Sequence, residues 1–333
     1  MPIAYLTTRG LEAKIVSERL ELKIPSRTEG AFPKQKHIPL ADIEHIVLDY
    51  SVNLSLQDLS KLLSRKIPVH FVAQGRMPAG VALPMNQFVL SKAQQIDACR
   101  NLEFCLENAK NLVVAKVQNQ KRVLQRLHTN RGKQFIGAGW FDSILRDAKN
   151  TESLDSLRGF EGACAGRYFE LLNSFFPEGL LLERRSRQPP HNEVNAILSY
   201  VYTILLTEIT SHVYATGLEP GWGFFHQPDD NKPSLALDLL EPFRAPVADA
   251  LCLDLMNHKR LKKEDFEYRN GGCFLKRESR RKLFVALEDR LEREFSSEQI
   301  GHRTTLRQTI IRQCYDIKRA FNNEGKYVPF LMN

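Results

Sequence analysis

Acidic side chains and one imidazole carry the pattern with the clearest chemical meaning in this sequence. Glu161 stands in the run Arg-Gly-Phe-Glu-Gly, and His226 follows a glycine-rich segment. The run Ser-Leu-Ala-Leu-Asp-Leu-Leu-Glu then supplies Asp238 and Glu241. Carboxylate oxygens together with a histidine nitrogen are donors that hold a catalytic Mg²⁺ or Mn²⁺ ion. The residue types therefore indicate a divalent-metal site.

Glu161 taken by itself allows two interpretations. On a helix that begins near it, its carboxylate shares a face with Tyr168 and Leu172, the side otherwise expected to be buried. A buried anion without a partner is strongly destabilising, so Glu161 would be protonated, paired with a cation or bound to a metal. The other interpretation is a glutamate in the first helical turn, stabilised by the helix dipole. The residue alone fits this second interpretation better.

Asp238 and Glu241 are three residues apart, which places both carboxylates on one helical face if Ser234 caps the helix. Two neighbouring anions repel each other, and a divalent cation removes that penalty. A solvated acidic face is the alternative, but the leucines around the pair favour burial. Pro242 disfavours helical geometry at Glu241, so we expect the helix to kink or restart there.

His226 follows two phenylalanines, where a histidine is more often a structural residue than a ligand. The glycines ahead of it predict a turn and a short extended segment rather than a helix. Its position just before the carboxylate pair favours the other role, in which it supplies the nitrogen of a mixed site.

The charge balance and the cysteines indicate the partner and the compartment. The 333 residues carry a formal charge of +8, which suggests a polyanionic partner, most commonly nucleic acid. The six cysteines form no CxxC pair and no zinc-ligand spacing, and they fit reduced core thiols of a cytoplasmic protein. Charged residues near the N-terminus argue against a signal peptide. The apolar run 194–206 is expected to be a buried helix and not a membrane span.

Hydrophobic periodicity divides the chain into two regions. Residues 1–88 contain short β-branched runs between turn signals and one helix capped by Ser55, which predicts a small N-terminal β domain. From about Ser91 to Leu127 the spacing is helical and fits a long packed helix better than a coiled coil. The fold class is thus α+β multidomain, with residues 89–333 as a larger all-α catalytic domain. We expect strands over 3–6, 13–16, 20–24, 45–48 and 69–72, and further helices over 141–149, 161–174, 193–214, 234–256, 280–295 and 305–322.

Two basic clusters and one polar stripe are candidates for binding DNA. One cluster precedes Pro189, and residues 259–282 carry ten Lys or Arg against four acids. Such runs are usually solvated surface, but each phosphate that they neutralise adds affinity for DNA. The polar stripe on the helix after Pro190 would either face the site or bridge helices in the core. The expected DNA contacts are Arg184, Arg185, Arg187, Asn195, Ser199, Tyr202, Arg244, Lys276 and Arg277.

The order of these motifs along the chain resembles the CRISPR-associated spacer-acquisition integrase family, the universal adaptation nuclease of prokaryotic immunity. The similarity covers residues 155–256 in detail, and a β domain followed by an α domain agrees over nearly the whole chain. The motifs are Leu-Arg-Gly-Phe-Glu161-Gly, Arg185-Ser-Arg-Gln-Pro-Pro-His-Asn-Glu-Val-Asn195, Gly217-Leu-Glu-Pro with Gly223-Phe-Phe-His226, and Ser234-Leu-Ala-Leu-Asp238-Leu-Leu-Glu241-Pro-Phe-Arg244.

The resemblance implies a ligand set and an assembly. Glu161, His226 and Glu241 would bind Mg²⁺ or Mn²⁺, with Asp238 as an additional ligand or a group behind the ligands. Glu241 fills a position that holds Asp or Glu in the family. The resemblance also implies a homodimer built through the β domains, with two such dimers flanking a dimer of a small companion subunit in a heterohexamer.

The implied activity is that of a divalent-metal-dependent DNA endonuclease and integrase acting on double-stranded and branched DNA. In integration, the 3′-hydroxyl of a short captured DNA attacks a phosphodiester at the border of a repeat in a CRISPR array. With water as the attacking group, the same site is a nuclease. Two alternatives stay open: a stand-alone nuclease for branched repair intermediates, and a non-catalytic DNA-binding scaffold whose carboxylates are structural.

Overall fold

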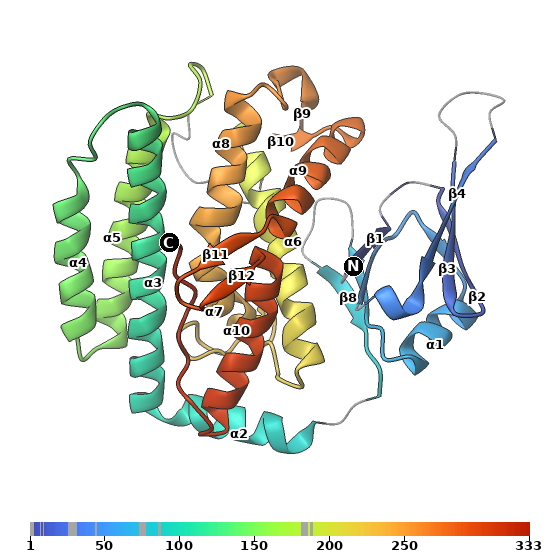
Figure 1. The fold of residues 1–333 in the computed structure, drawn as a ribbon, viewed down its shortest axis with the longest axis horizontal. Coiled ribbons are helices and arrows are strands. Elements are labelled where there is room, and N and C mark those ends of the chain that lie inside the picture. The colour runs from blue at the N-terminus through green and yellow to red at the C-terminus, as the bar shows by residue number, and fades with distance from the viewer. Residues whose placement is uncertain are drawn as a thin grey trace. The chain divides into compact units, whose positions relative to one another are not determined.

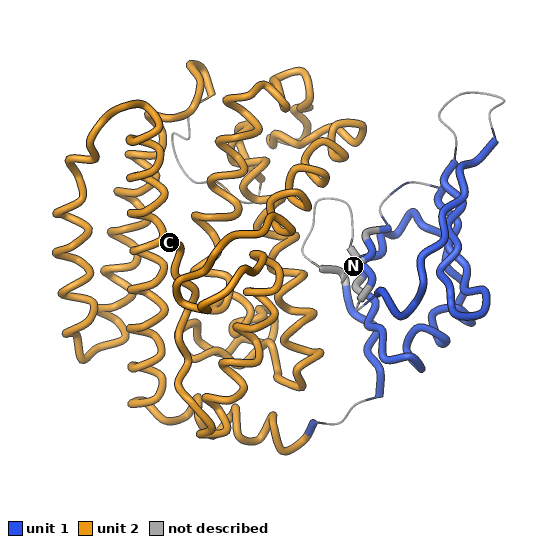
Figure 2. Tube along the Cα trace, in the orientation of Figure 1, with its two compact units in different colours: residues 1–88 blue, residues 89–333 orange. Residues whose placement is uncertain are grey.

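The chain folds into two compact units. The computed structural model describes residues 3–6, 8, 10–25, 32–43, 45–72, 78–85, 88–180, 186 and 189–333. Unit 1 comprises Met1–Phe88 and unit 2 comprises Val89–Asn333 (Figure 2). A small β region is followed by a larger helical region, which confirms the predicted fold class.

The described strands of unit 1 form two sheets. The first contains Ile3–Leu6 (β1), His45–Asp49 (β5), Val69–Val72 (β7) and Pro78–Ala82 (β8), in that order. Its first three strands run parallel, and β8 pairs antiparallel with β7. The second sheet contains Lys34–Pro39 (β4), Arg19–Ile24 (β3), Glu12–Val16 (β2) and Asn53–Leu54 (β6). In it, β3 pairs antiparallel with β4 and β2, and β6 pairs parallel with β2.

Alternation of apolar and polar residues explains which strands the sequence predicts. In β2 the side chains of Ala13 and Ile15 are buried between exposed neighbours, as the period of two requires. Strand β4 was not expected, because only Ile38 among its six residues is buried. Helix α1 (Leu56–Ser64) packs against β2 and β7. The predicted cap is confirmed, since Ser55 Oγ accepts the backbone N–H of Asp58 at 3.0 Å.

Unit 2 is built mainly of helices (Figure 1). They are α2 (Val89–Arg100), α3 (Leu102–Asn130), α4 (Ala138–Asn150), α5 (Leu154–Asn173), α6 (Glu193–Ala215), α7 (Ser234–Phe243), α8 (Ala250–Asn257), α9 (Arg280–Glu292) and α10 (Leu306–Phe321). The long helix α3 packs against α4, α5 and α7, and α7 also packs against α6. Short 3-10 helices cover Lys263–Asp265 and Arg277–Ser279 in unit 2, and Leu40–Asp42 in unit 1.

Two helix starts differ from the prediction. The stretch from about Ser91 to Leu127 is two helices, because the Asn101 side chain accepts backbone N–H groups of the next helix and so begins α3. Helix α5 begins at Leu154, where Ser153 Oγ accepts the N–H of Ser156 at 3.3 Å. Glu161 therefore lies two turns inside α5, and its assignment to a first helical turn is wrong.

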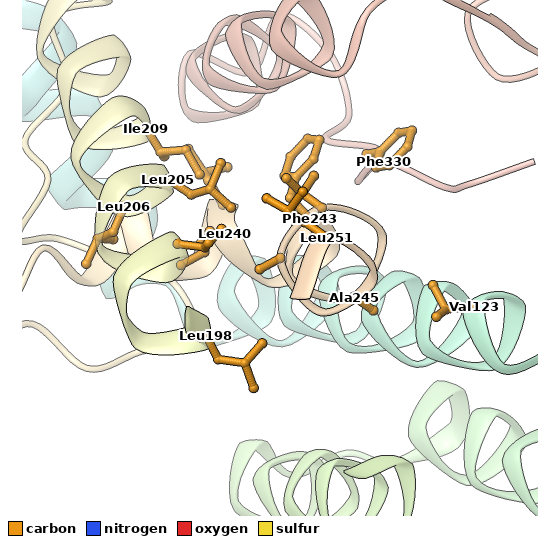
Figure 3. Packing of buried hydrophobic residues seen from close by; sticks show 14 of the residues in the cluster. Val123, Leu198, Leu205, Leu206, Ile209, Leu240, Phe243, Ala245, Leu251 and Phe330 are labelled. Atoms are coloured by element: carbon orange, nitrogen blue, oxygen red, sulfur yellow. The ribbon is translucent and has the colours of Figure 1, made fainter. Parts of the chain in front are cut away.

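Helix α6 is largely buried in the unit 2 core. It is long and apolar enough to pass a membrane-span test by length and composition, with a mean hydropathy of 1.2, but 67% of its most apolar window is buried inside the protein. Leu205 and Ile209 of α6 lie in one cluster with Leu240 and Phe243 of α7 (Figure 3). Burial of this helix agrees with the expectation for residues 194–206.

Helix α7 does not end at its proline. Pro242 lies inside α7, which continues into a π-helix, Arg244–Asp249, before α8 begins. The carbonyl of Pro242 accepts the side-chain amide of Asn119 at 2.7 Å, and the ring of Phe243 stacks on Phe330 at 5.0 Å. The expected restart at Glu241 is not found, since the α-helix runs through Glu241 and the irregular turn begins only at Arg244. Ser234 is not a cap: its hydroxyl donates to the Gln227 carbonyl at 2.7 Å.

Two short hairpins interrupt the helices of unit 2. They are formed by Phe266–Arg269 (β9) with Gly272–Leu275 (β10), and by Phe295–Ser297 (β11) with His302–Thr304 (β12). The expectation that residues 89–333 are all helical is wrong at these four strands. Each is only three or four residues long, which is too short for a periodicity to show.

Candidate active site

Three helices bring two distant carboxylates onto one ammonium group. Lys116 of α3 forms an ion pair with Oε1 of Glu161 on α5. The same Lys116 Nζ lies 2.5 Å from Oε2 of Glu241 on α7. Glu161 and Glu241, which are eighty positions apart in sequence, therefore converge on one point between α3, α5 and α7.

Glu241 is held between two cations. Its residue surface is 5% exposed, and its Oε1 lies 3.0 Å from Nε of Arg244. Burial would raise the pKa of Glu241, but the charges of Arg244 and Lys116 outweigh burial and lower the pKa to about 2. Within the part of the chain that the structure describes, however, neither Glu241 Oε2 nor Arg244 Nε makes a contact with hydrogen-bond geometry. Two close cations, Lys116 and Arg244, hold this carboxylate.

Asp238 organises the loop that carries His226. It has no exposed surface, and its carboxylate accepts the backbone N–H groups of Phe224 at 2.8 Å, Phe225 at 3.1 Å and His226 at 2.9 Å. It also lies 2.6 Å from the ring Nδ1 of His226. All four contacts tie the loop to α7, so Asp238 supports the imidazole and is not itself an open ligand.

The contact with Asp238 sets the state of the His226 ring. An Nδ1–H that donates to a carboxylate leaves Nε2 as the nitrogen with a free lone pair. Burial would lower the pKa of His226, but the hydrogen bond and the charge of Asp238, together with the charge of Glu241, outweigh burial and raise it. The side chain of His226 is 36% exposed, so its outer nitrogen is within reach of a substrate.

A glycine and an arginine fix the same loop. A Cβ at Gly223 would lie 2.6 Å from Asp238 Oδ2 and 2.8 Å from the His226 carbonyl, so only glycine fits there. Arg158 of α5 donates to the Phe225 carbonyl at 3.1 Å. The loop is thereby linked to the helix that carries Glu161, whose side chain is 26% exposed.

The three predicted ligands do not form a ready metal cluster. Among the described residues, no group of three or more His, Cys, Asp or Glu side chains is placed to hold a metal ion. The ammonium of Lys116 lies between two of the predicted ligands instead. The charge of Glu241 is among the causes that raise the pKa of His226.

Two of the expected DNA contacts, Asn195 and Tyr202, make contacts within the protein. Asn195 has no exposed surface, and its side chain accepts the N–H of Ser186 at 3.1 Å, so its assignment as a DNA contact is wrong in this structure. The hydroxyl of Tyr202 donates to Asp249. Its ring lies 4.8 Å from the guanidinium carbon of Arg244, which holds Glu241.

Three of the other expected DNA contacts are partly accessible. Ser199, Lys276 and Arg277 are half-buried. Within residues 259–282, Arg260 lies 3.3 Å from Asp254 and Lys282 lies 2.7 Å from Asp265. Part of the positive charge of this cluster is therefore neutralised. Arg184, Arg185 and Arg187 lie outside the described residues.

Lys116 is the residue of this site that the sequence interpretation missed. Lys116 follows Leu112 by four positions and Val113 by three, so it falls on the apolar face of its helix. A lysine on such a face needs a buried acidic partner. The position of Lys116 on the apolar face thus predicts a buried acidic partner, but it does not identify which residue that partner is.

Known proteins similar to this chain agree in sequence and in fold. Residues 4–289 match the family model described as CRISPR associated protein Cas1. A CRISPR-associated endonuclease Cas1 of Thermus thermophilus is 32% identical over 329 residues, with 98% of each chain covered. A CRISPR-associated exonuclease Cas4/endonuclease Cas1 fusion of Geobacter sulfurreducens is 31% identical over 301 residues, with 87% of this chain and 54% of the fusion covered. The chain thus spans about half the length of that fusion.

Solved structures extend the similarity of fold. A CAS1 protein from Thermotoga maritima superposes with a TM-score of 0.79 at 24% identity, with 97% of this chain and 98% of that chain covered. A casposase bound to integration product gives a TM-score of 0.83 at 22% identity, with 99% and 93% covered. On the match over residues 4–289 and the relative at 32% identity, this chain belongs to the Cas1 family of CRISPR-associated proteins.

Proposed function

We propose that this chain is a divalent-metal-dependent DNA integrase and endonuclease that inserts short foreign DNA into a CRISPR array. The observation that carries the proposal is the convergence of Glu161 and Glu241 on one cationic position. Helix α7, which carries Glu241, also holds the imidazole of His226 through Asp238. Family membership supports the choice of DNA as substrate. The structurally similar casposase, which is described as bound to integration product, supports strand transfer.

The donor set fits Mg²⁺ or Mn²⁺ at this position. Glu161 and Glu241 would supply oxygens, and His226 would supply Nε2. Glu241 Oε2 is buried and lies 2.5 Å from the ammonium of Lys116, so the position already accepts positive charge. When bound, the metal would polarise a phosphoryl oxygen and stabilise the charge that develops on it.

The remaining side chains prepare the site for that chemistry. Asp238 keeps a proton on Nδ1 of His226, which leaves Nε2 with a lone pair for a ligand. Arg244 fixes Oε1 of Glu241 and leaves Oε2 to the centre of the site. In strand transfer, the 3′-hydroxyl of the captured DNA attacks the phosphodiester, a new P–O bond forms, and the displaced 3′-oxygen leaves with a proton. No covalent bond to the protein is needed.

DNA and a companion subunit complete the proposed system. Of the similar structures, one is a Cas6-RT-Cas1–Cas2 complex and another is a Cas1–DNA complex, and these support a Cas2-type companion and a DNA partner. We assign double-stranded and branched DNA to the basic surface of residues 259–282. A homodimer through unit 1, within a heterohexamer, follows from the family resemblance.

An integration assay tests the proposal. The chain, with and without the companion subunit, is incubated with short DNA duplexes and a supercoiled plasmid that bears a repeat. Covalent joining that needs Mg²⁺ or Mn²⁺ and stops in EDTA is the expected result. Cleavage of branched DNA without joining would show a repair nuclease, and metal-independent binding without strand chemistry would show a scaffold.

A further inference from the structure

Lys116 is a buried lysine with acidic partners on two other helices. Its residue surface is 6% exposed, and the buried side chains of Leu112, Val113 and Val117 lie near it on α3. A buried ammonium is tolerated only when counter-charges surround it. Glu161 and Glu241 supply those charges.

The ammonium takes the place where a metal would be expected. Glu161 Oε1 and Glu241 Oε2 both point to Lys116 Nζ, and these are the oxygens that the proposed metal needs. One position between two carboxylates cannot hold an ammonium and a divalent ion together, because the two cations would repel at close range. Binding of one must displace the other.

Such a displacement concerns the Lys116 side chain and not its helix. The backbone of α3 is anchored one turn further on, where Asn119 donates to the carbonyls of Pro242 at 2.7 Å and Phe330 at 3.0 Å. Asn119 also accepts the N–H of Met332 at 2.8 Å. Lys116 itself donates a hydrogen bond to Glu161, and its ammonium lies 2.5 Å from Glu241 Oε2. The helix is therefore fixed, and a metal that takes these oxygens has to break only the contacts of a flexible four-carbon side chain.

We propose that Lys116 is an internal counter-cation that holds Glu161 and Glu241 together before the metal arrives and competes with the metal for their oxygens. The proposal rests on the metal site of the proposed function and adds a positioning residue to it. Lys116 stabilises the metal-free protein and weakens metal binding. A lysine with a purely structural role would stabilise both states equally.

A measurement of Mn²⁺ binding distinguishes a Lys116 that competes with the metal from a purely structural Lys116, and it does not depend on catalytic activity. The full chain and the Lys116→Met variant are titrated with Mn²⁺ by calorimetry and by electron paramagnetic resonance, and are melted in EDTA and in excess Mn²⁺. We expect Lys116→Met to melt lower than wild type in EDTA and to bind Mn²⁺ about tenfold more tightly, within the range of typical coupling between two competing ligands. The rise in Tm on adding Mn²⁺ should therefore be larger in the variant.

A second lysine on the same helix provides the control. Lys121 lies 2.5 Å from Asp142, which is 54% exposed, so Lys121→Met removes a surface ion pair from α3. This variant should bind Mn²⁺ as wild type does. If Lys116→Met does not fold in EDTA, Lys116→Gln, which keeps a hydrogen-bond donor without the charge, is purified with Mn²⁺ and then depleted of it.

The outcomes separate this proposal from the proposed function. Equal or weaker Mn²⁺ binding by both Lys116 variants, with wild type binding Mn²⁺, overturns the competition and leaves the metal site intact. Binding by the variants but not by wild type supports the competition strongly. No Mn²⁺ binding by any folded form overturns the metal site and, with it, the role of Lys116.

Discussion

Two buried charge clusters in unit 2 use similar residues for different purposes. Arg307 of α10 is 1% exposed and donates to Glu208 of α6 at 2.8 Å and to Glu288 of α9 at 2.8 Å. It also donates to Glu292. Lys116, in contrast, meets Glu161 and Glu241 with one ammonium, and Glu241 Oε2 has no hydrogen bond among the described residues.

The difference lies in how completely each cluster is satisfied. The guanidinium of Arg307 directs separate N–H groups at three carboxylates, which suits a permanent connection between three helices. In the Lys116 cluster one ammonium serves two carboxylates, and the side chains of Glu161 and His226 are 26% and 36% exposed. A satisfied network supports the fold, whereas an incompletely satisfied one marks the place where a ligand binds.

The largest expected effect is loss of strand transfer on His226→Ala. Without the imidazole the proposed metal loses its nitrogen ligand, and we expect activity to fall by about 100-fold or more. The integration assay measures the activity, and fluorescence anisotropy should show DNA affinity close to that of wild type. His258→Ala is the control, because that side chain is 71% exposed. Full integration by His226→Ala would remove His226 from the mechanism.

A change in the Arg307 cluster should affect stability instead. Arg307→Met leaves Glu208, with no exposed surface, without its strongest counter-charge, and we expect the free energy of unfolding to fall by about 3–5 kcal/mol. Urea denaturation followed by tryptophan fluorescence measures this in unit 2, since Trp140 and Trp222 both lie there. Arg303→Met, which removes an exposed pair with Glu294 at 3.0 Å, should cost less than about 1 kcal/mol.

Acid pH should lower the stability of the folded protein through His212, whose pKa is affected by Glu208 and Arg307. Burial lowers the pKa of His212 from 6.5 to about 4, against the charge of Glu208, which raises it. Below pH 6.5 the unfolded chain binds a proton that the folded chain does not, so the free energy of unfolding falls as the pH drops towards 4. The loss from this group is roughly 3 kcal/mol. His212→Asn should flatten this part of the pH profile, and parallel profiles for the two proteins would exclude His212 as the cause.

Asp238→Asn should give a smaller functional effect than loss of His226. The amide keeps the shape of the side chain but loses the charge that orients the imidazole, and such changes behind a metal ligand cost about 10–100-fold in metal affinity or activity. Mn²⁺ titration and the integration assay both measure it. Asp229→Asn, which alters an exposed loop pair with Lys232 at 2.9 Å, should change neither. Unchanged Mn²⁺ affinity in Asp238→Asn would show that Asp238 acts on the fold alone.

The sequence predicted the fold class and most elements because their periodicities are long and regular. Alternation in β2 and the apolar spacing in α6 and α10 each span enough residues to show. The break at Asn101 was missed because the apolar pattern runs across it. The start of α5 was missed although Ser153 is a recognisable cap.

The site was only partly predictable for a different reason. Residue chemistry selected Glu161, His226 and Glu241, and the family resemblance grouped them as ligands. The position of Lys116 between two of them depends on how α3, α5 and α7 pack, which no local pattern records. Asn195 was misassigned because a polar residue at helical spacing looks the same whether it faces solvent or the core.

Anomalous diffraction from crystals grown with Mn²⁺ tests the central claim most directly. The account predicts one strong Mn²⁺ peak bound by Glu161, His226 and Glu241, with the Lys116 ammonium moved away from both carboxylates. An ion bound elsewhere, or Lys116 still paired with Glu161 and Glu241 at saturating Mn²⁺, would contradict it.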